Sequence, residues 1–206
     1  MFYCVEQLMG DSRNVSSIGS KKTIIVTGFG PFSIFRENPS WVAVTSLKSL
    51  WTELAADILG ASPKYVTITN DDDRTLLYYL KKTLSTYELL TIEIPVKYVD
   101  SLSIVPRFWE AESPALVINC GVSSLAKCLT LEQKASNSGY FRIDESNCLP
   151  QHCCAYPLEN ERTIESAFDM HSASAWISKY CLSLFSVNLK FLLLLYFITN
   201  TYKNHS

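Results

Sequence analysis

Thiol, imidazole and carboxylate groups are the side chains of this sequence that could do chemistry, and some of them lie close together. Cys148, His152, Cys153 and Cys154 share one short segment, and thiolate and imidazole are ligands that zinc prefers. A second cysteine pair is missing, and adjacent cysteines chelate poorly, so an ordinary loop is favoured over zinc. We therefore expect no metal ion and no other cofactor.

A second group of candidates is the acidic run Asp71, Asp72 and Asp73, which follows Asn70. Carboxylates in such a run could bind a metal ion. Asparagine followed by acidic residues is also how helices commonly begin, because the cap and the helix dipole both favour it. A capped helix start is the favoured interpretation.

A glycine turn with two phenylalanines follows a short β-branched run, and it resembles a ligand site more than the acidic run does. Gly28 and Gly30 let the backbone turn and approach a neighbour closely. A dinucleotide-binding loop would need a third glycine, where this chain has Ser33. Phe29 and Phe32 are either core side chains or the walls of an apolar slot for a small flat ligand.

The elements that must position these residues alternate between strand and helix. Asn38 precedes Pro39, which is typical of a capped helix start, and Gly121 follows an apolar run in a second glycine-containing loop. The pattern predicts an α/β fold. Predicted strands lie near Thr23–Thr27, Lys64–Thr69, Leu89–Ile94, Ala115–Asn119 and Leu182–Val187, and predicted helices near Asn38–Leu59, Asn70–Leu84, Asp100–Trp109 and Thr163–Tyr180.

Composition limits the classes of function. The chain has 206 residues, 48% hydrophobic and 18% charged, with a net charge of -2. One domain with a real core is expected, and nothing in the charge favours binding to nucleic acid. Residues 1–20 are Ser-rich, and we expect them to be disordered. They lack the apolar run of a secretory signal, which together with seven cysteines predicts a reducing compartment.

The apolar run Leu189–Ile198 leaves alternatives open. It is too short for a membrane span of about 20 residues, and joining it to Cys181–Val187 brings Asn188 and Lys190 into the middle. Only the joined stretch approaches the length of a span, and it gives a C-terminal membrane anchor as one alternative. A buried strand or helix segment, or an unpaired apolar tail, is favoured.

Six short motifs, in this order, resemble pyroglutamyl-peptidase I, a family of cytosolic cysteine peptidases that remove N-terminal 5-oxoproline from peptides. The motifs are Val26-Thr-Gly-Phe-Gly-Pro-Phe32, Glu93-Ile-Pro-Val-Lys-Tyr98, Cys120-Gly-Val-Ser-Ser124, Leu129-Thr-Leu-Glu132, Asn137-Ser-Gly-Tyr140 and Gln151-His-Cys-Cys154.

The resemblance implies a single-domain three-layer α/β/α sandwich around a twisted mixed sheet, spanning residues 21–187. It implies that Glu132 is the catalytic acid and that Phe29 and Phe32 sandwich the pyroglutamyl ring. Asn38 and the loop at Gly121 and Val122 match positions that line the site in relatives. The implied partners are peptides with an N-terminal pyroglutamate.

The sequence also departs from the family pattern. Thr52–Tyr87 has no counterpart and is expected to be a peripheral insertion. The family nucleophile stands in Asp-Ala-Gly-Arg-Tyr-Leu-Cys, whereas this chain has Asn188-Leu-Lys-Phe-Leu-Leu-Leu without cysteine. Residues 188–206 are read as an atypical, truncated or replaced tail, and no histidine matches the catalytic one. We therefore expect an inactive peptidase homologue, a non-catalytic binding module for pyroglutamyl or other small amides, or a tail-anchored protein.

Overall fold

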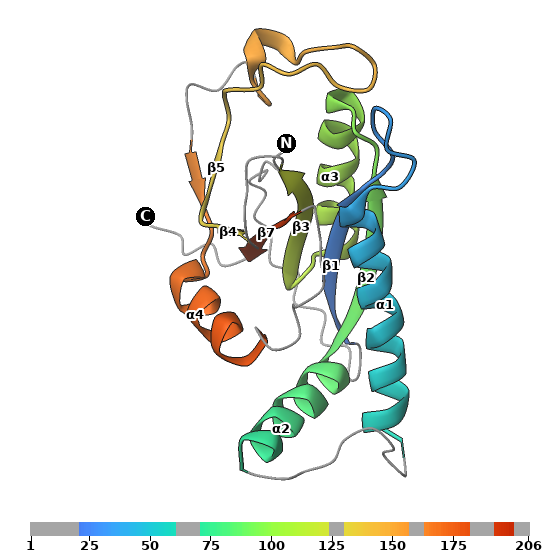
Figure 1. The fold of residues 1–206 in the computed structure, drawn as a ribbon, viewed down its shortest axis with the longest axis vertical. Helices are drawn as coiled ribbons and strands as arrows, with labels where there is room; N and C mark the ends of the chain where they lie inside the picture. Colours follow the sequence, from blue (N-terminus) through green and yellow to red (C-terminus); the bar gives the residue numbers. More distant parts are fainter. Residues whose placement is uncertain (1–20, 61–70, 124–129, 157–162, 182–191, 200–206) are drawn as a thin grey trace.

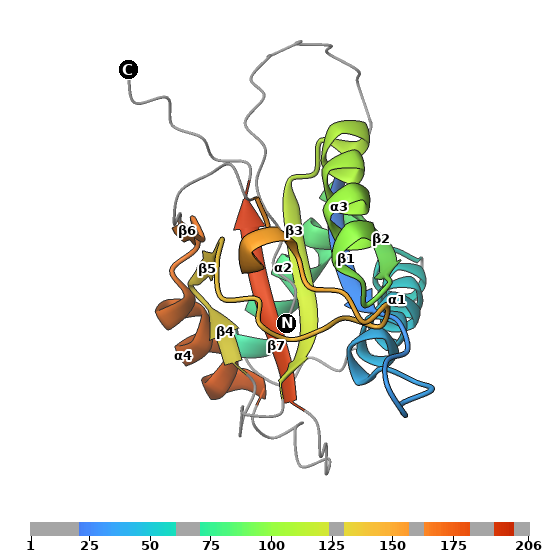
Figure 2. The same ribbon diagram turned by 90° about the horizontal axis from the view of Figure 1, so that it is seen from above.

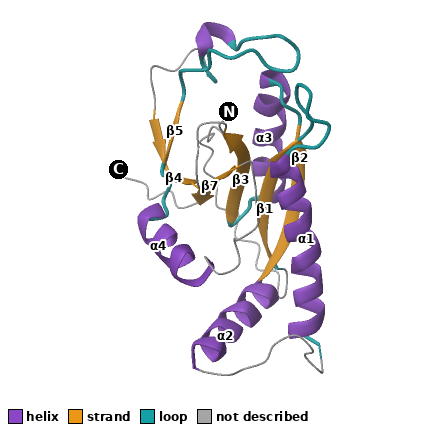
Figure 3. Ribbon diagram, viewed as in Figure 1, coloured by secondary structure: helices purple, strands orange, loops and turns teal. Residues whose placement is uncertain are grey.

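A computed structural model describes residues 21–60, 71–123, 130–156, 163–181 and 192–199 (Figure 1). Strands and helices alternate through most of this part of the chain (Figure 3). The strands are β1 (Lys22–Phe29), β2 (Tyr87–Ile94), β3 (Leu116–Ser123), β4 (Thr130–Glu132), β5 (Lys134–Ser136), β6 (Thr163–Glu165) and β7 (Leu192–Thr199). The helices are α1 (Pro39–Ile58), α2 (Asp71–Thr86), α3 (Tyr98–Glu112), the short 3-10 helix η1 (Gln151–Cys153) and α4 (Met170–Cys181).

The main sheet has the order β2-β1-β3-β7-β4 and is mixed. Strand β1 runs parallel to both β2 and β3, β7 is antiparallel to β3, and β4 is parallel to β7. A second, two-stranded sheet pairs β5 with β6. The mixed sheet that the sequence led us to expect is confirmed.

Alternate side chains of β1 pack under different helices. Ile25 and Phe29 belong to a buried cluster with Val105 and Phe108 of α3, whereas Val26 packs with Val44 of α1. Because successive side chains of a strand point to opposite faces, α1 and α3 cover opposite faces of the sheet, as Figure 2 shows. The predicted three-layer sandwich is confirmed.

Helix α1 begins as its sequence predicts. Asn38 is the N-cap, its side chain accepts a hydrogen bond from the Ser40 amide, and Pro39 occupies the first turn. Helix α3 is longer than expected and runs through Pro106. Its N-cap, Lys97, makes no side-chain capping bond. The first turn is held instead by Asp144, whose Oδ2 accepts a hydrogen bond of 2.9 Å from the Tyr98 amide.

Two local expectations were wrong. Gly121 and Val122 are part of β3 and pair with Leu194 and Leu193 of β7, so they do not form a loop. The segment Thr163–Glu165 is strand β6, and the helix expected from Thr163 begins at Met170. In both cases a partner strand distant in sequence supplies hydrogen bonds that local patterns cannot reveal.

The apolar run near the C-terminus contributes β7, which lies between β3 and β4 in the main sheet. The favoured alternative of a strand is therefore correct for Leu192–Thr199. Within the described residues, no helix combines the length and apolarity needed to cross a bilayer.

The expected insertion, 52–87, does not begin or end at an element boundary, because a helix runs across its first residue and a strand begins with its last residue and continues beyond it. It contains the last turns of α1, all of α2 and the first residue of β2. Ile58 and Leu84 are each 2% exposed, so both ends contribute buried side chains. That the range is a peripheral insertion stays a prediction. The strand expected at 64–69, the strand expected at 182–187 and residues 1–20 all lie outside the described residues.

Candidate functional site at the carboxyl end of β1

The glycine turn after β1 brings this strand very close to helix α1. A methyl group on Gly28 would lie 2.9 Å from both the carbonyl oxygen of Ser40 and Cα of Trp41, so only glycine fits there without movement of the helix. One residue beyond the strand, the Gly30 amide donates to the Ile94 carbonyl, 2.9 Å away. The turn is thus fixed against both α1 and the end of β2.

Asn38 and Ser40 hold the two ends of the turn together. The Asn38 Nδ2 donates to the Gly30 carbonyl at 3.0 Å, and its Oδ1 accepts from the Ser40 hydroxyl at 2.8 Å. The Ser40 hydroxyl in turn accepts from the Phe29 amide at 2.9 Å. Asn38 is 5% exposed and Ser40 is fully buried. Asn38, predicted to line a site, therefore helps to position the turn that carries Phe29.

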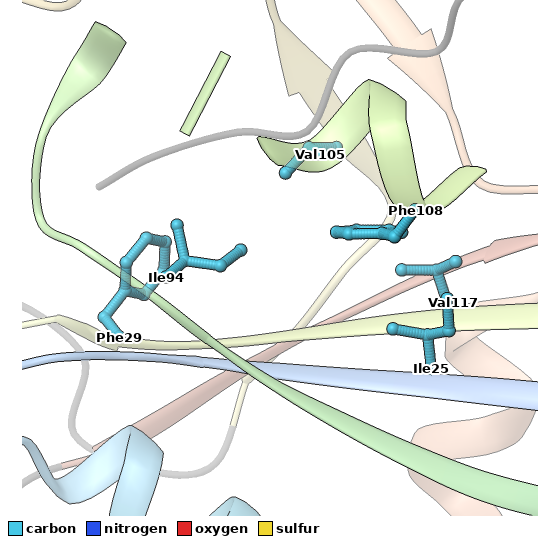
Figure 4. Close-up of a cluster of buried hydrophobic side chains, with 6 residues drawn as sticks. All are labelled: Ile25, Phe29, Ile94, Val105, Phe108 and Val117. Atoms are coloured by element: carbon cyan, nitrogen blue, oxygen red, sulfur yellow. The ribbon is translucent and has the colours of Figure 1, made fainter. Parts of the chain in front are cut away.

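Phe29 ends β1 and is 9% exposed. It packs beside Ile94 at one end of the buried cluster under α3, while Phe108 packs with Val117 and Ile25 at the other end (Figure 4). Its ring also lies over β3, because a methyl group on Gly121 would be 3.8 Å from Cε2 of Phe29. The structure thus brings together two residues that the sequence assigned to one site.

Phe32 lies apart from this cluster, in the loop before α1. It is half-buried and forms a β-bridge with Phe35, with ring centroids 5.1 Å apart. The loop is also tied to the segment after β5, because the Ser33 amide donates to Oε1 of Glu145 at 2.7 Å. Figure 1 shows this loop and η1 at the same end of the molecule. Phe35, which sequence reasoning did not select, is thus the aromatic partner of Phe32.

Glu132 ends β4 and is half-buried. Its register partner on β7 is Tyr196. Tyr196 is in turn the register partner of Asn119 on β3, and Asn119 is that of Thr27 on β1. Glu132 therefore lies in the same row of the sheet as Thr27, three strands away, or about 14 Å at the usual strand spacing. Val122, on β3, is also half-buried, one position beyond Gly121. Phe29, Gly121, Val122 and Glu132 share one sheet, whereas Phe32 and Asn38 lie between β1 and α1, so the predicted site residues do not all converge on one point.

Asn119 was missed by sequence reasoning, and it lies at the centre of this row. It is 7% exposed, and its Oδ1 accepts a hydrogen bond of 2.7 Å from the Thr27 hydroxyl. Its Nδ2 is buried and has no hydrogen-bond partner in the part of the chain that the structure describes. The sequence did contain a signal for Asn119: it is a polar residue in an otherwise apolar strand, and its side chain points to the face opposite that of Ile118 and Cys120.

The cysteines described by the structure lie in two settings. Burial raises the pKa of the Cys120 thiol to about 12, so this thiol stays protonated near neutral pH. The thiols of Cys148 and Cys154 donate to the main-chain carbonyls of Ser146 and His152. Across the described segments, no group of three or more His, Cys, Asp or Glu side chains could hold a metal ion.

The segment 137–156, which carries these cysteines, is itself firmly anchored. The Asp144 carboxylate accepts hydrogen bonds from the amides of Tyr98, Ser146 and Cys148. Asn137 makes a paired contact with the main chain of Tyr156, donating at 3.0 Å and accepting at 2.8 Å. The segment is thus held against the start of α3 by its own polar side chains.

Comparison of the sequence with known proteins identifies relatives. No family model matches the chain. Pyroglutamyl-peptidase 1 of Homo sapiens and that of Rattus norvegicus are each 32% identical to it over 151 residues, which are 73% of this chain and 56% of those proteins. A human pyroglutamyl-peptidase 1-like protein is 36% identical over 64 residues, 31% of this chain and 33% of that protein. The chain thus spans little more than half the length of the curated relatives it matches.

Solved structures share the fold. Pyroglutamyl peptidase I from Bacillus amyloliquefaciens matches with a TM-score of 0.53 at 19% identity, over 77% of this chain and 62% of that one. Pyrrolidone carboxyl peptidase from Thermococcus litoralis matches with a TM-score of 0.52 at 13% identity, over 85% and 76% of the two chains. The chain is therefore related to pyroglutamyl-peptidase I in sequence and has the same fold.

Proposed function

We propose that this chain, a relative of pyroglutamyl-peptidase I, recognises the 5-oxoproline ring at the N-terminus of peptides and does not hydrolyse it unaided. The observation that carries the proposal is the proximity of Phe29, the last residue of β1, to Gly121 in the neighbouring strand β3, in a chain 32% identical to pyroglutamyl-peptidase 1 over 151 residues. Ligands of α/β sheets commonly bind at the carboxyl ends of parallel strands. The ligand is a peptide in the cytosol rather than a nucleic acid or a membrane.

Ring recognition is supported by an aromatic residue held in a fixed backbone. The Phe29 amide is fixed by Ser40, and the chain that follows is fixed by Asn38 through the Gly30 carbonyl. In the proposal, Phe29 and Phe32 contact the two faces of the lactam ring, and Val122 borders it. Stacking on aromatic rings favours a flat ring over a flexible chain.

The absence of turnover follows from the requirements of thiol catalysis. A thiolate must attack the amide carbon, and a supported imidazole must protonate the leaving amine. Glu132 can orient an imidazole but cannot replace one. The buried Cys120 thiol has its pKa raised to about 12, and the Cys148 and Cys154 thiols donate to main-chain oxygens rather than to an imidazole. The peptide segment that matches the nucleophile motif of the family, 188–194, contains no cysteine.

Two measurements on the purified chain test the proposal. Isothermal titration with 5-oxo-L-prolinamide is expected to show binding, whereas a fluorogenic pyroglutamyl amide is expected to give no fluorescence above the buffer rate. An L-prolyl amide of the same fluorophore is the matched control, because it lacks the ring carbonyl. Failure to bind 5-oxo-L-prolinamide would contradict ring recognition.

Turnover is tested separately with a cysteine variant. Release of 5-oxoproline by the unaltered chain, abolished by Cys181→Ser, would make Cys181 the nucleophile and overturn the non-catalytic assignment. As a positive control, 1–187 is joined to the corresponding C-terminal segment of human pyroglutamyl-peptidase 1. This chimera is expected to be active, and Glu132→Gln is expected to reduce its rate, since the carboxylate supports the base.

A further inference from the structure

The side chain of Asn119 carries a buried amide group that is left without a partner. Asn119 is 7% exposed, and its Oδ1 accepts from the Thr27 hydroxyl at 2.7 Å, but among the described residues its Nδ2 has no hydrogen-bond partner. Exchanging the assigned positions of the amide nitrogen and oxygen would still leave one of them without a partner. The Thr27 hydroxyl can hydrogen-bond to only one of the two atoms. A buried polar atom without a partner costs free energy, so its presence needs a physical reason.

The position of Asn119 supplies that reason. Thr27 and Asn119 are register partners on the parallel strands β1 and β3. Phe29 and Gly121 are the next residues on the same face, and the ring of Phe29 lies over Gly121. These four residues form a block at the carboxyl ends of the two strands. Within it, Asn119 precedes Gly121 by two residues on the same face of β3, and the Phe29 ring lies over Gly121.

We propose that Asn119 determines ligand specificity in this chain by donating a hydrogen bond from Nδ2 to the ring carbonyl of a bound 5-oxoproline. This rests on the proposed function. In the complex, the ring of Phe29 turns off Gly121 and the flat lactam takes the space above the glycine. The ring carbonyl then meets the amide that has no partner in the free chain.

The chemistry of the lactam fits this arrangement. The lactam group of 5-oxoproline presents one strong acceptor, its carbonyl oxygen, beside one donor, the ring N–H. The neutral amide donor of Asn119 suits the neutral carbonyl acceptor. A proline ring has no such acceptor and carries a charged amine, so binding it would leave Nδ2 unpaired beside a buried charge. The side-chain amide of Asn119 therefore discriminates between peptides with an N-terminal pyroglutamate and peptides with an N-terminal proline.

Two five-membered-ring carboxamides measure the contribution of the lactam group. 5-Oxo-L-prolinamide carries the ring carbonyl and the ring N–H, and cyclopentanecarboxamide lacks both, so the part of the preference that Asn119→Leu removes is the part that depends on Asn119. By calorimetric titration, the unaltered chain is expected to bind 5-oxo-L-prolinamide about tenfold more tightly than cyclopentanecarboxamide. A factor of about ten is the usual contribution of one buried hydrogen bond to affinity. In Asn119→Leu this preference is expected to fall to about twofold or less, mainly because the first ligand binds more weakly. The side-chain amide resonance of Asn119 is expected to shift only with 5-oxo-L-prolinamide.

Further variants separate binding from folding. Asn119→Leu leaves the Thr27 hydroxyl without its acceptor, so the double variant Thr27→Val with Asn119→Leu is measured as well. Asn137→Leu is a matched control, since Asn137 is 6% exposed and both of its amide atoms are bonded to Tyr156. Asn137→Leu is expected to lower the unfolding midpoint more than the double variant, because it breaks satisfied bonds.

The outcomes distinguish the two proposals. An unchanged tenfold preference in both Asn119 variants would overturn the role of Asn119 and leave ring recognition standing. No binding of either ligand by the unaltered chain would overturn ring recognition and this inference with it. Loss of the preference together with an unshifted Asn119 resonance in the unaltered chain would overturn the direct hydrogen bond.

Discussion

The main-chain nitrogen of Phe29 donates a hydrogen bond of 2.9 Å to the hydroxyl of Ser40, joining the end of β1 to the first turn of α1. The same hydroxyl donates to the Asn38 side chain, which donates to the Gly30 carbonyl. Three polar side-chain atoms thus satisfy the backbone of a tight turn that carries the aromatic residue of the candidate site.

Removing the Ser40 hydroxyl is therefore expected to destabilise the protein. Ser40→Ala leaves the buried Phe29 amide without an acceptor, and the expected loss is about 1–3 kcal/mol of unfolding free energy. Ser46→Ala is the control, since the Ser46 hydroxyl is exposed and donates only to the Val42 carbonyl of its own helix. Its effect is expected to stay within about 0.5 kcal/mol. Equal urea midpoints for the two variants would contradict the role assigned to Ser40.

Two glycines of the same region are expected to differ in their tolerance of a methyl group. Gly28→Ala would place Cβ 2.9 Å from main-chain atoms of Ser40 and Trp41, and we expect a loss of about 1–3 kcal/mol, typical of overpacking. Gly121→Ala meets only Cε2 of Phe29 at 3.8 Å, an ordinary contact.

We therefore expect Gly121→Ala to stay within about 1 kcal/mol of the unaltered chain in stability. Because its methyl group fills the space proposed for the lactam, it should weaken binding of 5-oxo-L-prolinamide. Thermal unfolding and titration of both variants check the pair. Undiminished binding by Gly121→Ala would argue against the proposed ligand position.

Asp144 is expected to make stability depend on pH in the acid range. Partial burial tends to raise the pKa of its carboxyl, but hydrogen bonds from the amides of Tyr98, Cys148 and Ser146 outweigh this, so the pKa is lowered. A lowered folded-state pKa stabilises the fold above the unfolded value of about 3.9, and this contribution is lost as the pH falls through the folded value.

The measurement is urea unfolding between pH 7 and pH 2. Asp144→Asn is expected to be less stable than the unaltered chain at pH 7, because an amide cannot accept all three bonds as a carboxylate does. The difference between the two proteins should shrink as the pH falls below 4. A difference that stays constant over this range would show that the Asp144 charge does not contribute.

Cysteine labelling tests the environment assigned to Cys120. Its thiol is buried and its pKa is raised to about 12 by desolvation, whereas Cys148 is exposed. Iodoacetamide reacts with thiolates, so at pH 8 Cys148 should react quickly and Cys120 should stay unmodified until the protein unfolds. Mass spectrometry of peptides after timed quenching measures both rates. Modification of Cys120 as fast as Cys148 in the folded protein would contradict the buried assignment.

The sequence predicted the elements whose contacts are mainly local or strongly periodic. Helix α1 has its Asn38 cap, Pro39 and an apolar face, and the β1 and β2 strands follow from short apolar runs. These signals lie within a few residues of each other, so no tertiary information is needed to read them.

Elements that depend on distant partners could not be predicted in the same way. Ile164 suits a helix face by its spacing, yet it lies opposite Ala135 in the β5–β6 pair, beside a 2.6 Å ion pair between Lys134 and Glu165. Gly121 reads as a turn until β7 is known to pair with it. Pairing energy depends on the partner and on burial, neither of which a single segment reveals.

For the candidate site, the sequence selected Phe29 and Gly121, which are in contact range, and missed Asn119. The first two belong to glycine–aromatic motifs that can be recognised locally. Asn119 became a candidate only when its Nδ2 was found buried without a partner, which is a property of the packed structure. Whether Asn38, Val122, Phe32 and Glu132 contact a ligand stays a prediction.

Strand β7 is the only link in the described sheet between β4 and the strands that precede it, and it pairs with residues far earlier in the chain. During synthesis β1, β2 and β3 can pair before β7 has left the ribosome, but β4 and Glu132 cannot join them. Until then β3 presents an open edge, the kind that other chains can join. Slow completion of the β7 pairing would prolong the exposure of that edge at a stage when the strands that carry Phe29 and Gly121 are already paired.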